Sequence, residues 1–451
     1  MIRVLSIAMA FVVLVSCGDD AGPKSFVGSD ACSEGGIVRE GDVSIGTLED
    51  LQALAGDGSS RLCVDGKLFI EKTTLTSLEG LSNLYSVGGL RLRANDALTN
   101  LDGLLNLESV DGDLEISNNR ALTNVDSLHQ LTRIGGELSI RENSSLTSLE
   151  GLRNVTRVDG GLWIFANDPL DYNERKQRHN DSMGDERAAR QVKGSIFKEG
   201  EALSDLEGLR NLQSIGGSLK LGLSIGYNFG LVSLEGLRSL KTVGGDLHIQ
   251  HNFAVTSLRG LHNLQSVGGE LHILHNDLLT SLEGLDNLRS VGANLSVYRN
   301  ISLASLEGLH SVQSVGDELI IRDNRWLTSI GGLRSLHTVG GDATIWGNDI
   351  LTDLSGLDKL ARIESRLMIH RNVSLVALEG LNSLQSVGKD LQIDGNTSLV
   401  SLTALDNLQS VGEHLWIEDN PNLSSDLVQA VADRLVAGGF AGKMTTKGNQ
   451  P

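Results

Sequence analysis

An asparagine that recurs every 24 residues dominates this sequence of 451 residues. The spacing holds over a first run of four asparagines and, after one interruption, over a second run of nine. The thirteen positions are Asn95, Asn119, Asn143, Asn167, Asn228, Asn252, Asn276, Asn300, Asn324, Asn348, Asn372, Asn396 and Asn420. A fixed period of this length is typical of a solenoid, in which one coil cannot bury its apolar residues alone and stacking on its neighbours does so. The sequence therefore predicts thirteen stacked coils.

The coil that ends at Asn300 shows how the apolar residues are used. Leu295 and Val297 alternate with Asn294, Ser296 and Tyr298, and this period of two predicts a short strand with Leu295 and Val297 pointing inward. The remaining inward layers come from Leu279, Leu282, Leu285, Leu288 and Val291. No run keeps a helical period for three turns, so we expect no helix inside the coils.

Each coil also needs corners. Gly292 and its equivalents, such as Gly268-Gly269 and Gly340-Gly341, predict a sharp corner with positive φ. The periodic asparagine marks another corner, where its amide can satisfy backbone groups of the turn. Stacked one per coil, these asparagines would form an internal ladder. Thirteen coils at a strand spacing of about 4.8 Å predict a rod about 60 Å long.

The two ends of the array carry cap signals, as the open ends of a solenoid require. Residues 32–74 predict an N-terminal cap with Thr47 as the N-cap of a short helix that runs to Leu54. Residues 75–420 form the thirteen-coil solenoid, and residues 421–451 predict a C-terminal cap. In that cap Ser425 or Asp426 would begin a helix that ends at Gly438-Gly439.

The first residues resemble a bacterial lipoprotein signal. Arg3 is followed by an apolar stretch too short to span a bilayer with ease, and then by Leu14-Val15-Ser16-Cys17, which resembles a lipobox. This predicts a signal peptide over residues 1–16, a lipidated Cys17 and a flexible tether over residues 17–31, with acyl chains as the membrane anchor. The alternative is an ordinary signal peptide with a chance cysteine. Gly18 after the cysteine favours the outer membrane or cell surface of a bacterial envelope.

Cysteine usage and charge narrow the class of protein further. With Cys17 acylated, Cys32 and Cys63 are the remaining pair in an exported chain, which predicts a disulfide, with two free thiols as the alternative. The formal net charge is −19, with acidic and basic residues interspersed along the chain. Such a surface would repel phosphate backbones, so nucleic acid is not expected as a partner.

The coil motif resembles the receptor L-domain, the leucine-rich β-helix of insulin and growth-factor receptor ectodomains, over roughly residues 41 to 420. One coil shows it as Leu258-Arg259-Gly260-Leu261, Leu264, Val267-Gly268, Leu271-His272-Ile273 and Asn276. The resemblance implies a right-handed single-stranded β-helix with a ligand-binding or adhesive role. No catalytic residues belong to the motif. The single long array, with no cysteine-rich module after it, differs from receptor L-domains, so no growth-factor-like ligand is carried over.

The repeat is interrupted once, between Asn167 and Asn228. The inserted loop, residues 171–202, is highly charged and includes Arg175, Arg178 and Arg187 as candidate binding residues. A long loop on a rigid scaffold often carries function, while a tolerated insertion without a role is the alternative.

Outward strand positions supply the other candidate binding residues. They are Trp163, Phe165, Tyr298, Trp346, His370 and Trp416. Outward tryptophan and tyrosine suit stacking on sugars or packing against a protein, although scattered surface aromatics are also normal.

Histidines form pairs one coil apart, His248 with His272 and His251 with His275. Stacking would bring each pair to within about 5 Å, where two imidazoles can share a metal. No carboxylate or cysteine completes the set at the same strand positions, so His248 and His272 are only weak metal candidates and no cofactor is expected.

No nucleophile elbow, P-loop or HExxH motif is found, and no enzyme is expected. The sequence thus favours a lipid-anchored envelope protein that binds a protein or a glycan. A structural envelope protein without a specific ligand is the first alternative, and a polysaccharide-active β-helix enzyme is the second.

Overall fold

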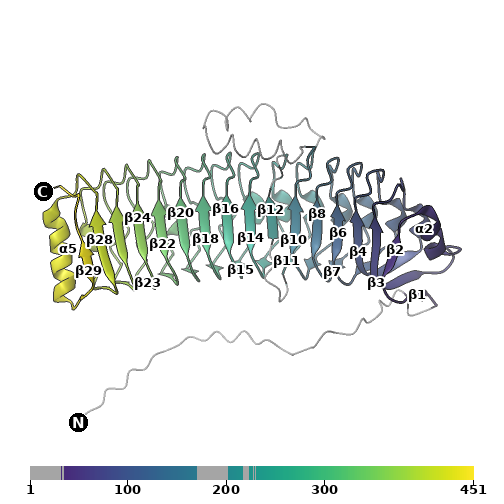
Figure 1. The fold of residues 1–451 in the computed structure, drawn as a ribbon, viewed down its shortest axis with the longest axis horizontal. Helices are drawn as coiled ribbons and strands as arrows, with labels where there is room; N and C mark the ends of the chain where they lie inside the picture. Colours follow the sequence, from purple (N-terminus) through teal and green to yellow (C-terminus); the bar gives the residue numbers. More distant parts are fainter. Residues whose placement is uncertain are drawn as a thin grey trace, which may run out of the picture.

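The computed structural model describes residues 32, 35–169, 202–216, 223–226, 228 and 230–450. The described chain winds into an elongated rod of stacked coils with a helix at each end (Figure 1). The predicted all-β solenoid with capping helices is therefore confirmed. The signal peptide, Cys17, the tether and the inserted loop with Arg175, Arg178 and Arg187 lie outside the described residues.

The main sheet of the rod is a column of parallel strands, one per coil. Along β18 the first and third side chains, Leu295 and Val297, are buried, as the sequence alternation predicts, and the equivalent residues of the other strands whose burial the structure describes are buried too. Its members are β4 (Leu84–Arg93), β6 (Leu114–Ser117), β8 (Leu138–Arg141), β10 (Leu162–Phe165), β12 (Leu223–Gly226), β14 (Leu247–Gln250), β16 (Leu271–Leu274), β18 (Leu295–Tyr298), β20 (Leu319–Arg322), β22 (Ala343–Trp346), β24 (Leu367–His370), β26 (Leu391–Asp394) and β28 (His414–Glu418). Each strand pairs in register with the equivalent strand one coil away.

A second column of two-residue strands lies on another side of the coil, where the sequence shows only an inward valine or isoleucine. These strands are β5 (Ser109–Val110), β7 (Arg133–Ile134), β9 (Arg157–Val158), β11 (Ser214–Ile215), β13 (Thr242–Val243), β15 (Ser266–Val267), β17 (Ser290–Val291), β19 (Ser314–Val315), β21 (Thr338–Val339), β23 (Arg362–Ile363), β25 (Ser386–Val387) and β27 (Ser410–Val411). Two residues are too few for alternation to be recognised, so the sequence does not predict this column.

On the third side many coils make a single 3-10 turn instead of a strand. These turns are η1 (Glu79–Leu81), η2 (Asp102–Leu104), η3 (Asp126–Leu128), η4 (Glu150–Leu152), η6 (Glu207–Leu209), η7 (Glu235–Leu237), η8 (Arg259–Leu261), η9 (Gly331–Leu333) and η10 (Thr403–Leu405). No α-helix interrupts the coils in the described part of the chain. Leucine side chains from all three sides meet in one core that runs the length of the rod.

The N-terminal end is closed by β1 (Ile37–Arg39), β2 (Val43–Ile45), α2 (Leu48–Ala55) and β3 (Leu62–Glu71). Thr47 is the N-cap of α2, as the sequence predicts, and it forms a reciprocal capping box with Asp50. Cys32 and Cys63 form a disulfide, with their Cα atoms 6.3 Å apart. This bond joins the start of the described chain to β3 and so holds the cap together.

The C-terminal end is closed by α5 (Ser425–Ala437) and β29 (Lys443–Thr445), which pairs with β28. The N-cap of α5 is Ser424 rather than Ser425 or Asp426, because the Ser424 hydroxyl accepts from the backbone N–H of Asp426. The helix ends at Gly438, as predicted. The closing strand β29 is a difference from the sequence prediction, which gives the cap a helix alone.

The prediction of positive φ at Gly292 is wrong, and so it is for Gly268, Gly269, Gly340 and Gly341. A Cβ atom built on Gly292 would lie 2.0 Å from the carbonyl oxygen of Gly268 in the preceding coil. Glycine is required there because the stacked coils approach closely, not because the backbone is left-handed.

Left-handed backbone occurs instead at the residue that directly precedes a ladder asparagine. The φ angles there lie between 51° and 67° at Ala94, Asn118, Glu142, Ala166, His251, His275, Arg299, Asp323, Gly347, Arg371, Gly395 and Asp419. Most of these residues are not glycine. Their backbone strain is maintained coil after coil next to the buried asparagine ladder, whose hydrogen bonds hold the corner in place.

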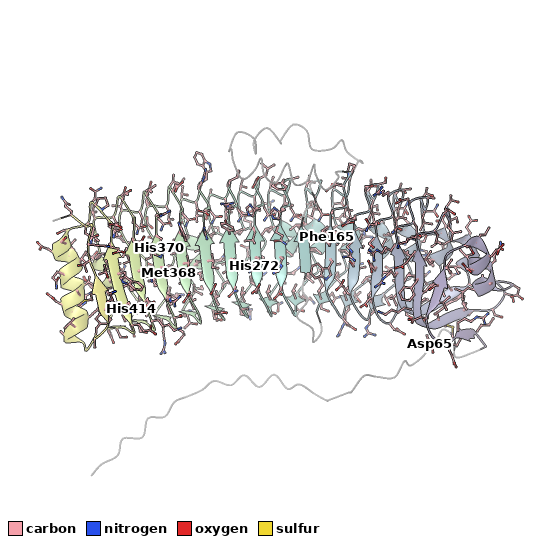
Figure 2. All side chains as sticks on the ribbon, viewed as in Figure 1. Asp65, Phe165, His272, Met368, His370 and His414 are labelled. Atoms are coloured by element: carbon pink, nitrogen blue, oxygen red, sulfur yellow. A yellow bond between two sulfur atoms is a disulfide. The ribbon has the colours of Figure 1, made fainter. Side chains whose placement is uncertain are left out.

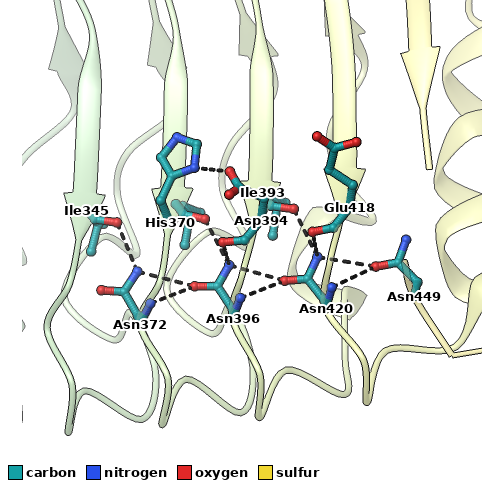
Figure 3. A network of polar contacts seen from close by, with 10 residues as sticks. Ile345, His370, Asn372, Ile393, Asp394, Asn396, Glu418, Asn420 and Asn449 are labelled. Carbon is teal, nitrogen blue, oxygen red and sulfur yellow. Dashed lines mark hydrogen bonds and ion pairs between the residues drawn. The ribbon is translucent and has the colours of Figure 1, made fainter. Parts of the chain in front are cut away.

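The thirteen ladder asparagines are buried along the rod, and Figure 3 shows the linked amides at its C-terminal end. In the coil of Asn396, the side-chain N–H donates to the carbonyl of Ile369 at 2.8 Å, and the side-chain oxygen accepts from the backbone N–H of Asn372 at 3.1 Å. Thr73 extends the ladder at the N-terminal end by donating to Asn95, and Asn449 extends it beyond Asn420. The sequence period misses Asn449 because it follows Asn420 by 29 residues instead of 24.

Candidate ligand-binding surface

The main strand column presents two files of side chains, at the two alternate positions that follow the two inward residues of each coil. Leaving β12 aside, the first file contains Arg91, Glu115, Ser139, Trp163, His248, His272, Ser296, Ile320, Thr344, Met368, Gln392 and Trp416. The second file contains Arg93, Ser117, Arg141, Phe165, Gln250, Leu274, Tyr298, Arg322, Trp346, His370, Asp394 and Glu418. Parallel pairing in register makes residues of one file neighbours along the rod.

Three of the predicted binding residues, Tyr298, Trp346 and His370, come together in the second file. Arg322 completes a run over four consecutive coils, and we call Tyr298, Arg322, Trp346 and His370 the aromatic ridge. The guanidinium carbon of Arg322 lies 4.2 Å from the Trp346 ring centre and 5.4 Å from the Tyr298 ring centre. The rings of Trp346 and His370 are 6.0 Å apart. At about 4.8 Å per coil, the ridge extends over roughly 14 Å.

Further cationic and acidic groups surround the ridge. Arg299 lies 5.2 Å from the Tyr298 ring centre and Arg371 lies 6.0 Å from that of Trp346. Asp323 pairs with Arg322 at 3.2 Å, and Asp394 bonds to Nδ1 of His370. These contacts hold the ring orientations, because each ring has a charged neighbour on the adjoining coil or corner.

The other three predicted aromatic residues lie apart from the ridge. Trp163 and Phe165 share β10, four coil steps and about 19 Å from β18. Trp416 lies on the last full coil and stacks on His414 at 4.9 Å. Phe165, His272, His370 and His414 can be followed along the rod in Figure 2. The structure therefore brings three of the six predicted aromatic and histidine residues together in the ridge and leaves the other three at two separate places on the rod.

The paired histidines continue the ridge toward the middle of the rod. His251 and His275 stack at 4.8 Å, and His275 meets Tyr298 edge-on at 5.4 Å. In the first file His248 and His272 stack at 4.6 Å with their planes 7° apart. Burial lowers the pKa of the His272 imidazole and the nearby His248 acts in the same direction, while Glu270 and Asp246 oppose them.

A carboxylate does reach the first histidine pair, although none occupies the same strand position. Glu270 directly precedes β16, and its Oε2 lies 3.3 Å from Nε2 of His272 and 3.8 Å from Nε2 of His248. Sequence reasoning misses Glu270 because it searches the strand positions, whereas this side chain reaches the pair from the corner before the strand.

A separate hollow of about 260 Å³ lies near the N-terminal end of the strand face. Its lining consists of Lys67, Leu90, Arg91, Asp113, Glu115, Glu137 and Arg141. Burial pushes the pKa of Glu115 upward, but hydrogen bonds from Arg141 and Ser117 outweigh it and the net shift is downward. Glu115 also pairs with Arg91 at 2.8 Å. Because these charges already satisfy one another, the hollow is a weaker candidate than the ridge.

The molecule is thus a parallel β-solenoid that presents a continuous side-chain surface on a rigid column of strands. The family model of the receptor L domain matches residues 88–183, about a fifth of the chain, and this match is similarity over the first coils. No curated protein matches the chain. Within the described residues, no helix is long and apolar enough to cross a membrane.

Proposed function

We propose that this chain is a recognition protein of the bacterial envelope that binds an extracellular protein ligand through the aromatic ridge. The observation that carries the proposal is the arrangement of Tyr298, Arg322 and Trp346 on consecutive coils, with the guanidinium between the two rings. Tyrosine, tryptophan and arginine are the residues enriched at the energetic centres of protein interfaces. The rigid strand column supports the proposal, because side chains held on it lose little conformational entropy when a ligand binds.

The charge around the ridge favours a ligand with acidic groups. The chain as a whole carries a net charge of −19, yet Arg299, Arg322 and Arg371 gather around two aromatic rings. Asp323 is shared by Arg299 and Arg322, so the three arginines outnumber the acidic group that pairs with them. An acidic and partly apolar partner surface complements such a patch. The receptor L-domain match supports a binding role rather than catalysis.

A glycan is the second candidate ligand. The side chains of Trp346 and Tyr298 are only partly buried, and sugars pack against accessible aromatic rings. Arg322 stands against one face of each ring, however, so less face is open for stacking. This is why we favour a protein.

Replacing Trp346 with alanine is expected to weaken ligand binding about 30-fold or more, since truncating a central aromatic anchor costs about 2 kcal/mol or more. The assay screens the soluble fragment 18–451 on a glycan array and on whole cells, and then measures affinity for the captured ligand. Trp416→Ala is the matched control, because Trp416 has the same side chain three coil steps away, in the other file. We expect it to bind normally.

Equal losses in the two tryptophan variants would contradict the ridge as the site. Binding that persists in Trp346→Ala but disappears when residues 171–202 are deleted would place recognition on the inserted loop. If no ligand is found on either array or cells, a structural role in the envelope is favoured instead.

We also propose that Cys17 is lipidated and anchors the protein in the outer membrane or on the cell surface. The lipobox-like segment Leu14-Val15-Ser16-Cys17 supports this. Cys17→Ser is expected to move the protein from the membrane fraction to the soluble fraction and to abolish labelling with a fatty-acid analogue. Labelling that survives the substitution would exclude Cys17 as the acceptor.

A further inference from the structure

His248, Glu270 and His272 form a compact cluster in the middle of the strand face, which we call the His–Glu–His cluster. His248 on β14 and His272 on β16 are register partners one coil apart, and Glu270 comes from the corner before β16. One potential ligand atom from each of the three residues lies within 4.8 Å of the other two. All three side chains are partly buried. His272 marks this place in Figure 2.

The charges around the cluster favour a bound cation. Among the described residues, the ion-pair partners of Glu270 are the two histidines, and no lysine or arginine pairs with it. Asp246 adds a second nearby negative charge. Glu115, another partly buried carboxylate on this face, is by contrast neutralised by Arg91 and Arg141. Here that neutralising charge is missing within the described part of the chain.

The hydrogen bonds around the cluster orient its ligand atoms. Asn294 donates to Oε1 of Glu270 at 3.1 Å, so that Oε2 is left facing the histidines. Nε2 of His248 is shielded from solvent and has no hydrogen-bond partner among the described residues. A buried imidazole nitrogen without a partner costs free energy unless something coordinates it. Carboxylates held by a neighbouring amide are the usual support of a metal site.

A second carboxylate and histidine cluster, formed by Asp390, Glu413 and His414, does not share these properties. Asp390 already accepts from Arg366 at 3.1 Å and bonds to Nδ1 of His414 at 2.8 Å. The arginine supplies the positive charge that a metal would otherwise bring. His414 therefore provides a matched control for His272.

We propose that His248, Glu270 and His272 bind one Zn²⁺ ion. Two imidazoles and one carboxylate form a ligand set that suits zinc, and a fourth coordination position would remain for water or an external ligand. Binding requires the two parallel rings to tilt from their 7° stack, because their in-plane lone pairs must converge on one ion. The site is independent of the aromatic ridge and does not depend on the proposed function.

The test is calorimetric titration of the full-length chain, purified in detergent and freed of metal with a chelator, with ZnCl₂ at pH 7.5. We expect one Zn²⁺ per chain. His272→Ala and His248→Ala should each weaken its affinity about 100-fold or more, and Glu270→Gln about tenfold or more. His414→Ala should leave the affinity and the stoichiometry unchanged. Circular dichroism of each variant confirms that the solenoid is folded.

Sub-stoichiometric binding by the parent chain would overturn the proposal, as would unchanged affinity in folded His272→Ala. An equal loss in His414→Ala would show general binding to surface histidines instead of a site. Glu270→Gln keeps the shape of the side chain, so its loss of affinity in a folded chain would support coordination by the carboxylate.

Discussion

Replacing Asn300 with alanine is expected to lower the free energy of unfolding by about 2–6 kcal/mol, because two buried groups would lose their bond to Asn300 at about 1–3 kcal/mol each. Asn300 is fully buried. Its side-chain N–H donates to the carbonyl of Ile273 at 2.7 Å. Its side-chain oxygen accepts from the backbone N–H and the side-chain N–H of Asn276, at 3.1 and 3.2 Å. Alanine leaves the Ile273 carbonyl and the Asn276 backbone N–H without this partner inside the core, whereas the Asn276 side-chain N–H keeps its bond to the carbonyl of Ile249 at 2.9 Å.

The matched control is Asn287→Ala. Asn287 also donates to a carbonyl of the preceding coil, that of His262 at 2.7 Å, but this bond is exposed. Water can replace it, so we expect a loss below about 1 kcal/mol. Urea unfolding followed by circular dichroism measures both variants against the parent chain. Equal losses would show that burial of the ladder does not determine its contribution to stability.

The sequence predicts the fold because the same physical demand is repeated in every coil. Asn300, Leu295 and Val297 occupy positions whose environment recurs at 24-residue intervals, so the pattern reveals the coil, its inward face and its corner asparagine. Because the same residue types recur in the same environment in every coil, a departure in one coil does not hide the pattern. This is why the stacking and the ladder follow from the sequence, whereas the helices at both ends are predicted from local capping residues such as Thr47.

Features that depend on the contact between coils do not follow from the sequence of one coil. Gly292 suggests a left-handed corner, yet it is needed because a carbonyl of the preceding coil approaches it closely. Asn449 joins the ladder only after a helix and a strand have returned the chain to the end of the rod. Both depend on neighbours that local sequence patterns do not specify.

The candidate site is less predictable than the fold because it consists of departures from the repeat. Outward alternation identifies Tyr298, Trp346 and His370 individually, and the pairing register then joins them through Arg322. Glu270 approaches the histidines from a corner, outside the alternating positions. Aromatic and charged side chains at outward positions are not required by the coil, so no periodic signal marks them as a group.

Asp277→Asn is expected to make the protein more stable at pH 8 and to flatten its stability between pH 4 and pH 7. Asp277 directly follows a ladder asparagine and is only 4% exposed. Burial raises the pKa of its carboxyl from 3.8 to about 7. Its Oδ2 is shielded from solvent and has no hydrogen-bond partner among the described residues. The ionised form is therefore destabilised in the folded chain.

The sign of the pH effect follows from this raised pKa. Below about pH 3 Asp277 is protonated in both the folded and the unfolded chain, and it causes no loss of stability. As the pH rises toward 7, the unfolded chain gives up the proton while the folded chain keeps it, so stability falls. Above about pH 7 the loss levels off at roughly 4 kcal/mol, given about 1.4 kcal/mol for each unit of pKa shift. Asparagine cannot ionise, so the variant avoids this loss.

The measurement is the free energy of unfolding in urea at pH 4, 6 and 8 for Asp277→Asn and for a matched control, Asp349→Asn. Asp349 directly follows Asn348, three coils later, and is partly exposed, so water solvates its carboxylate. The parent chain carries many other carboxylates, and taking the difference between variant and parent removes their common contribution. We expect that difference to grow with pH only at position 277. A constant difference would mean that the Asp277 carboxylate is solvated in the folded chain, since only a buried carboxyl retains its proton to neutral pH.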